Sequence, residues 1–172
     1  MRLDPASGDG HRAGRKNRNE GYAIMRHVIS AGLCLLAQAS VAQTVRSCDT
    51  FEANARNLIF PVAENTASYA QGNIRLIALD TGGEPACCSA HLMVLLPAPE
   101  GPGQICALIS ADGGTGWLGT YLPGAVADYD PETGLTVSVP AREYGEVHPT
   151  PLSVVVTIDQ QTGVVTAETG PP

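Results

Sequence analysis

Four residues in one short stretch, Cys87, Cys88, His91 and Met93, are of types that bind soft metal ions. Thiolate, imidazole and thioether groups favour copper or zinc, and three of these side chains would share one face of a strand. The spacing lacks the Cys-x-x-Cys pair typical of closed zinc sites, and disulfide formation would remove the thiolates. We therefore interpret His91 as a hydrogen-bonded sheet residue, with a metal-binding module as an alternative.

A second group of possible ligands consists of Asp128, Asp130 and Glu132, which alternate before Gly134. Their carboxylates are hard oxygen ligands of the kind that calcium accepts, but the spacing does not match an EF-hand loop. Acidic turns are commonly just solvated. A bound cation at these residues is thus a further alternative, and our prediction is that the chain carries no cofactor.

The run Asp80-Thr81-Gly82, which follows the apolar residues 76–79, resembles the active-site loop of aspartic proteases. The resemblance implies catalysis by two aspartates that share one proton, which a chain with one copy supplies as a homodimer. Gly83 stands where that family usually has Ala or Ser, and no clear flap hairpin follows. Our preferred interpretation is that Asp80 closes a strand before a turn, and a homodimeric hydrolase is the alternative.

Four cysteines, Cys48, Cys87, Cys88 and Cys106, follow residue 42. An even number of cysteines in an exported chain predicts two disulfides. Because neighbouring residues on a strand point to opposite faces, we expect Cys87 and Cys88 each to have a distant partner. Cys48 would then bond to one of them and Cys106 to the other.

The segment from Met25 to Ala42 has the pattern of a secretory signal peptide. Met25-Arg26-His27 is positively charged, residues 28–37 are apolar, and Ser40-Val41-Ala42 places small residues at the cleavage positions. We expect residues 1–24 to be a disordered or mis-annotated upstream extension and residues 25–42 to be cleaved. Residues 43–172 would form a single β-rich domain in the periplasm or outside the cell.

The composition after residue 42 disfavours two classes of partner. This part has four Arg, no Lys and fourteen Asp and Glu, a formal charge of −10, whereas the whole chain has −7. An acidic surface repels phosphate backbones and anionic lipids, so we expect no nucleic-acid partner and no binding to a membrane surface. The apolar run is shorter than the ~20 residues that a bilayer span needs, so we also expect no membrane span after signal cleavage. The length suits one domain with an ordinary core.

The hydrophobic pattern predicts a mainly β fold. Asp49 and Glu52 resemble a capping box, and apolar residues at helical spacing up to Pro61 predict one short N-terminal helix. Short strands are expected at 74–79, 90–96, 105–110, 135–139, 152–158 and 164–167. Such strands between Gly- and Pro-rich turns favour a small antiparallel β-sandwich or a small barrel, with the doubly apolar 90–96 strand at its centre.

Two Asp-x-x-Thr-Gly runs, Asp130 to Gly134 and Asp159 to Gly163, are each followed by a predicted strand. We interpret both as hairpin loops, in which Asp caps the turn and Gly adopts positive φ. No Gly-x-Ser-x-Gly motif surrounds Ser89 or Ser110, so no catalytic triad is indicated. The sequence therefore favours a non-catalytic binding or structural module, with a protein, a small molecule or a glycan as its partner.

Overall fold

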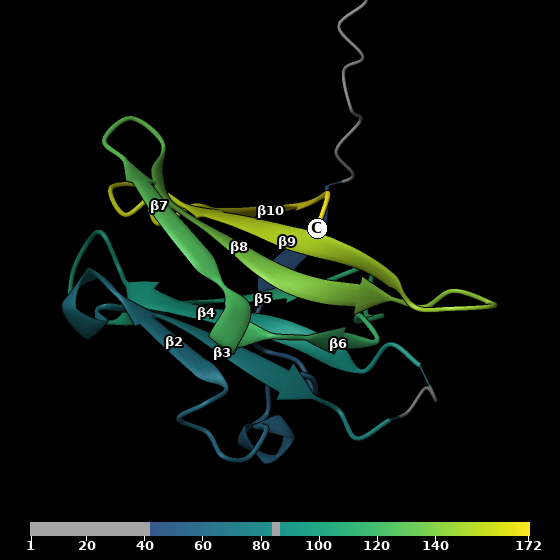
Figure 1. Ribbon diagram of the computed structural model, residues 1–172. Coiled ribbons are helices and arrows are strands. Elements are labelled where there is room, and N and C mark those ends of the chain that lie inside the picture. Colours follow the sequence, from purple (N-terminus) through teal and green to yellow (C-terminus); the bar gives the residue numbers. More distant parts are fainter. Residues whose placement is uncertain (1–41, 84–86) are drawn as a thin grey trace, which may run out of the picture. The chain divides into compact units, whose positions relative to one another are not determined.

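The computed structural model describes residues 42–83 and 87–172, which form two antiparallel β-sheets (Figure 1). The predicted upstream extension and nearly all of the predicted signal peptide lie outside the described residues. Sheet 1 has the order β1-β5-β4-β3-β2, with β1 (Thr44–Ser47), β2 (Thr66–Tyr69), β3 (Ile74–Asp80), β4 (Ala90–Pro97) and β5 (Gln104–Ser110). Sheet 2 has the order β10-β9-β8-β6, and β7 also pairs with β8; its strands are β6 (Gly119–Thr120), β7 (Val126–Asp130), β8 (Gly134–Glu143), β9 (Thr150–Ile158) and β10 (Val165–Gly170).

All six predicted strands form, as β3, β4, β5, β8, β9 and β10. The doubly apolar strand β4 lies at the centre of sheet 1, as expected. Sequence patterning did not identify β1, β2, β6 or β7, which are short or polar. The mainly β, antiparallel prediction is therefore confirmed.

The prediction of an N-terminal helix is wrong. In the part of the chain that the structure describes, helical geometry is limited to three short 3-10 turns, η1 (Ala55–Asn57), η2 (Ala70–Gly72) and η3 (Leu122–Gly124). The carbonyl groups of Phe51 and Glu52 accept from Asn57 Nδ2 at 2.8 and 3.0 Å instead of from the backbone N–H groups four residues on, and Phe51 O also accepts from Asn54 N–H at 3.2 Å in a turn. No helix in the described ranges is long and apolar enough to cross a bilayer.

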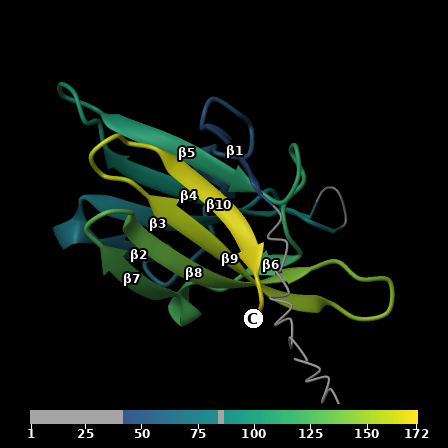
Figure 2. The same ribbon diagram turned by 90° about the horizontal axis from the view of Figure 1, so that it is seen from above.

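One hydrophobic core lies between the two sheets. Strands of sheet 2 run over those of sheet 1 when the molecule is seen from above (Figure 2). Side chains from both sheets join one buried cluster and are fully shielded from solvent, among them Ile74, Leu76, Leu92, Val94, Ile109, Val137, Val139, Val154, Val156 and Ile158. Each such side chain contributes roughly 1.5–3 kcal/mol of hydrophobic free energy, so this shared core holds the sheets together.

A linking segment, residues 116–121, makes backbone hydrogen bonds to both sheets. Trp117 exchanges two backbone hydrogen bonds, of 2.8 and 3.0 Å, with Ala90, the first residue of β4 in sheet 1. Leu118 then donates to the carbonyl of Arg142 at 2.9 Å, and Tyr121 donates to Pro140 at 2.8 Å, both on β8 of sheet 2. The segment therefore fixes one end of β4 relative to one end of β8.

A second connection, the crossing segment at residues 49–57, covers the outer face of sheet 1. It begins after Cys48, which is bonded to Cys106 of β5 with a Cα–Cα distance of 5.5 Å, and it ends where Leu58 bridges to Leu79 of β3. Beneath it, sheet residues outside the central cluster are also buried, namely Leu79, His91, Leu108 and Ser110. Figure 1 shows the turn of this segment on the side of sheet 1 away from sheet 2.

The predicted cysteine pairing is wrong. Cys48 is bonded to Cys106, and Cys87 is bonded to its neighbour Cys88. The expectation of distant partners assumed that Cys87 and Cys88 lie on a strand, but both precede β4, and Cys88 has φ of +74°. Outside a strand, neighbouring side chains do not have to point to opposite faces, so the geometric argument against their pairing does not apply.

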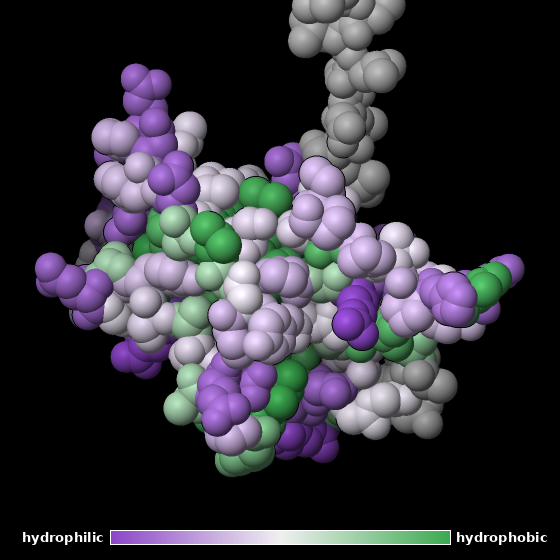
Figure 3. All heavy atoms as spheres, viewed as in Figure 1, coloured by the Kyte–Doolittle hydropathy of each residue, from purple (hydrophilic) through white to green (hydrophobic). Residues whose placement is uncertain are grey.

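The two Asp-x-x-Thr-Gly runs form the hairpin turns that the sequence predicts. Asp130 Oδ1 accepts from the backbone N–H groups of residues 132 and 133, and Asp159 Oδ1 accepts from those of residues 161 and 162. The backbone bonds lower the pKa of Asp130, and a hydrogen bond from the Thr162 hydroxyl, followed by the backbone bonds, lowers the pKa of Asp159. Gly134 and Gly163 have φ of +92° and +74°. The tip of the β7–β8 hairpin, at the upper left, is hydrophilic (Figure 3).

The two disulfides make different predicted contributions to stability. The Cys48→Ser/Cys106→Ser protein lacks a cross-link between residues 58 positions apart. From the loop-closure entropy, we expect its unfolding free energy to fall by about 4 kcal/mol. The Cys87–Cys88 bond closes no long loop, so the Cys87→Ser/Cys88→Ser protein should lose less than about 1 kcal/mol by this mechanism. Urea denaturation measures both; equal large losses would contradict the observed pairing.

Candidate ligand-binding site

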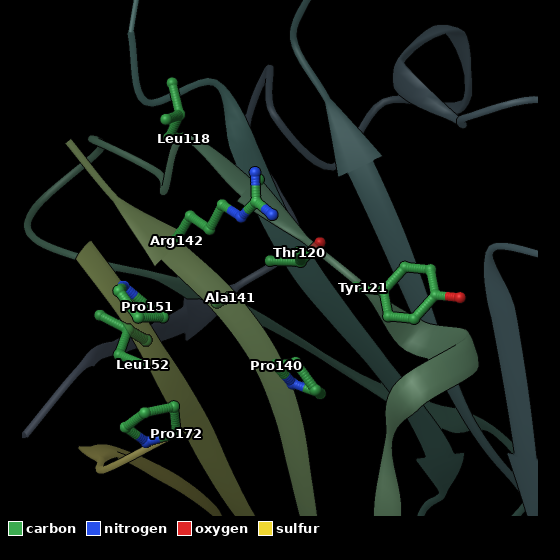
Figure 4. Close-up of a pocket in the computed structure, with 10 residues that line it drawn as sticks. Leu118, Thr120, Tyr121, Pro140, Ala141, Arg142, Pro151, Leu152 and Pro172 are labelled. Carbon is green, nitrogen blue, oxygen red and sulfur yellow. The ribbon is translucent and has the colours of Figure 1, made fainter. Parts of the chain in front are cut away.

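A hollow of about 510 Å³ lies at the end of sheet 2 where β6, β8 and β9 meet (Figure 4). Ala141 and Leu152 belong to or pack against the core, so the alternating residues Pro140, Arg142 and Pro151 face outward. Apolar groups supply most of the wall, and Arg142 supplies a positive charge. The wall is formed by Leu118, Tyr121, Pro140, Arg142, Pro151 and Leu152, with further contacts from neighbouring residues.

The hollow exists because a glycine stands opposite the arginine. Gly119 of β6 pairs with Arg142 of β8, and a Cβ atom placed on Gly119 would meet no atom within 4 Å. Pro151 of β9 is the partner of Arg142 on the other side. Arg142 thus has the open space beside Gly119 on one side and the apolar ring of Pro151 on the other. Its exposed side chain lies near Leu118 and Thr120 in Figure 4.

Tyr121 also lines the hollow, and the position of its ring depends on the turn that follows. Tyr121 is bonded through its N–H to Pro140, and its side chain is 61% exposed. In the η3 turn, a Cβ atom on Gly124 would approach Tyr121 Cδ1 to 2.8 Å and Pro140 Cγ to 3.3 Å. A glycine at 124 therefore lets the ring lie against the turn beside Pro140.

Two of the four arginines after residue 42 have partners, whereas Arg75 and Arg142 have none among the described residues, and of these two only Arg142 lines the hollow. Arg46 pairs with Glu52 at 3.0 Å, and the guanidinium of Arg56 lies 4.3 Å from the centre of the Phe51 ring. Within residues 42–83 and 87–172, Arg142 has no carboxylate within 4.0 Å. In a chain segment that carries a formal charge of −10, an unpaired cation beside an apolar hollow can hold an anion by charge-assisted hydrogen bonds.

The residues singled out in the sequence lie elsewhere. Asp80 is exposed at the end of β3, and its Oδ1 accepts from Gly82 N–H at 2.9 Å, as in a turn cap. Asp128, Asp130 and Glu132 are exposed on β7 and its hairpin. Across the described residues, His, Cys, Asp and Glu form no group of three that could hold a metal ion. The protease and metal hypotheses remain predictions.

His91 occupies a buried position under the crossing segment. Its Nδ1 lies 2.9 Å from Ser110 Oγ, and the two residues are 1% and 0% exposed, which agrees with a hydrogen-bonded sheet residue. Burial is the main cause that lowers the pKa of His91; Arg46 lowers it too, whereas Glu52 and Asp80 raise it. Because Ser110 is shielded from solvent, this pair cannot present a nucleophile to a substrate.

The sequence did not identify the hollow. Tyr121 lies in the Gly- and Pro-rich middle of the chain, and nothing in the sequence links it to Arg142. One available signal was that Arg142 is the sole cation after Arg75. No protein-family model matches the chain, and neither a curated protein nor a solved structure matches it. The candidate site therefore rests on this geometry.

The buried histidine predicts a pH-dependent stability. The folded state lowers the pKa of His91 below its ordinary value of 6.5, so the unfolded state binds more protons as the pH falls below that value. The unfolding free energy should decrease with falling pH from about 6.5 downward, by at most about 1.4 kcal/mol per pH unit for this one group. Urea denaturation at a series of pH values measures the slope.

The His91→Gln protein should show a smaller slope in this range, since it has no imidazole to protonate. His148→Gln, at an exposed position, is the matched control and should keep the slope of the original protein. A slope that survives His91→Gln and disappears in His148→Gln would refute the assignment to His91.

Proposed function

We propose that the chain is an exported, disulfide-stabilised β-sandwich domain that binds a small organic anion with an apolar body in the Arg142 hollow, without catalysing its reaction. One observation carries the proposal: Arg142 has no acidic partner within 4.0 Å among the described residues and lies beside apolar walls. The guanidinium would bind a carboxylate, while Tyr121 and the two prolines would cover the apolar part of the ligand.

The chemistry of the walls supports this ligand class. A planar guanidinium presents paired N–H donors that match a carboxylate, and hydrogen bonds to charged groups contribute about 1.5–3 kcal/mol. Pockets for small molecules are mostly apolar, with few polar groups that fix orientation. The hollow has that composition, with Leu118, Tyr121, Pro140 and Pro151 around one cation.

Two features support an oxidising location in the periplasm or outside the cell. The chain contains the disulfides Cys48–Cys106 and Cys87–Cys88, and disulfides persist mainly in oxidising compartments. Residues 25–42 have the charge, apolar length and small residues of a secretory signal. Stacking of two sheets over one core supports the assignment to a sandwich.

Binding can be tested with 3-phenylpropionate as the probe and 3-phenylpropionamide as its neutral match. We expect the carboxylate to bind with a Kd on the order of 1 mM or tighter and to shift the NMR signals of residues 119, 121 and 142. The amide should bind at least about tenfold more weakly, because it lacks the charge that pairs with Arg142. Equal affinity for the two probes would refute the ionic role of the arginine.

Two variants locate the site. Arg142→Gln should weaken binding of the carboxylate about tenfold or more, and Gly119→Leu should obstruct it by filling the open position beside Arg142. Arg75→Gln changes the net charge equally on an exposed residue of sheet 1 and should leave the affinity unchanged. If Arg75→Gln weakened binding as much as Arg142→Gln, only the overall charge would matter.

Export is tested by the mass of the processed chain. Expressed from the full sequence in a bacterial host, the protein should be recovered from the periplasm or medium with Gln43 as its first residue. Signal peptidase requires small residues at its recognition positions, so Ser40→Arg should leave the precursor uncleaved, whereas Ser89→Arg should not affect processing. Recovery of an unprocessed original chain in the cytoplasm would contradict the proposal.

A further inference from the structure

The two disulfides differ in what they connect. Cys48–Cys106 joins the residue after β1 to β5, directly beyond the last paired residues of the two strands, Ser47 and Ala107. Cys87–Cys88 joins two consecutive residues before β4. Breaking the second bond separates no distant parts of the chain, so the fold can persist in both redox states.

The backbone at Cys88 is held in an uncommon conformation. Its φ of +74° lies in the left-handed region, which residues with a Cβ atom seldom adopt. In the dithiol form, no ring ties Cys88 to Cys87, and the residue is free to return to negative φ. By contrast, nothing in the extended backbone of β1 and β5 favours separation of Cys48 from Cys106.

The Cys88 carbonyl group is connected to the linking segment. Cys88 accepts a hydrogen bond of 2.7 Å from Gly116 N–H, next to the paired Ala90 and Trp117. The approach is close, because a Cβ atom on Gly116 would come within 2.8 Å of that carbonyl oxygen. Any rotation of the Cys88 backbone therefore changes the contact that holds residue 116, beside the single tryptophan of the chain.

Reductants can reach this part of the molecule. Cys87 and Cys88 are both partly exposed, and Cys88 lines a second hollow, of about 460 Å³, together with Asp112, Trp117 and Tyr144. This hollow is distinct from the one that contains Arg142, since no residue lines both. Access through such an opening is what thiol–disulfide exchange requires.

We infer that Cys87–Cys88 is a reversible redox site that exchanges with dithiols, whereas Cys48–Cys106 remains oxidised as a structural cross-link. One thiolate of the dithiol attacks one sulfur of the pair and forms a mixed disulfide; its second thiolate then displaces the protein sulfur. The protein gains two electrons and two protons and carries two thiols, and the reductant becomes a disulfide. The reaction changes the position of residues 88 and 116 next to Trp117.

The site should favour dithiols over monothiols. After a monothiol attacks, the neighbouring cysteine is released beside the mixed disulfide and re-forms the original bond at high effective concentration. A dithiol has a second thiol of its own, which completes the reduction before that reversal. Glutathione at the same total thiol concentration is therefore the matched control for dithiothreitol.

The experiment reduces the folded protein with increasing dithiothreitol, alkylates it and maps the modified cysteines by mass spectrometry. We expect Cys87 and Cys88 to be alkylated at a dithiothreitol concentration at least about tenfold below that needed for Cys48 and Cys106. Trp117 fluorescence should change with the same midpoint. Simultaneous reduction of all four cysteines, or earlier reduction of Cys48–Cys106, would overturn the inference.

Two variants separate the redox site from a general structural effect. Cys87→Ser/Cys88→Ser should keep the fold and lose the fluorescence change, with Cys48–Cys106 still oxidised. Cys87→Ser/Cys88→Gly is the second variant, because glycine accepts the positive φ of residue 88 and keeps the contact with Gly116. A fluorescence change that persists in both variants at the same dithiothreitol concentration would show that the signal arises elsewhere.

Discussion

The backbone hydrogen bonds of residues 116–121 are the interaction on which both candidate sites depend. Trp117 is bonded to Ala90 on sheet 1, and Leu118 and Tyr121 are bonded to β8 on sheet 2. The side chain of Trp117 is only 1% exposed. Packing of this side chain in the core therefore holds the segment in place together with the backbone hydrogen bonds. This short segment places Gly119 opposite Arg142 and Gly116 against Cys88.

Charge gives the few cations of the domain distinct roles. In the acidic segment after residue 42 there are four arginines against fourteen acidic residues. Arg46 is paired with Glu52, which belongs to the segment that covers His91 and Ser110, and Arg56 lies over Phe51 of the same segment. Arg46, which lies on β1, therefore helps to hold the crossing segment on sheet 1, whereas the contact of Arg56 lies within that segment. Arg75 and Arg142 have no acidic neighbour of this kind among the described residues, and we assign Arg142 to a ligand because it also lines the apolar hollow.

The sequence predictions were correct where they depended on interactions between residues close together in the chain, and wrong where distant residues decide the structure. Alternating apolar residues identified the strands that build the core, and the two Asp-x-x-Thr-Gly runs identified their turns, because both signals are local. The predicted N-terminal helix does not form because the side-chain bonds of Asn57 and the connections at Cys48 and Leu58 impose a different path on this segment. The cysteine pairing failed because the strand alternation rule was applied to residues just outside a strand.

By itself, the sequence determined a mainly β, antiparallel fold, the central place of β4, the two hairpin turns and the acidity of the domain. Those properties follow from side-chain periodicity, turn residues and composition, which neighbouring residues carry. Only the tertiary structure decided which cysteines bond, how residues 49–57 cross sheet 1, and that Gly119, Tyr121, Arg142 and Pro151 surround one hollow. These outcomes depend on contacts between strands far apart in the chain, and no local pattern encodes their registers.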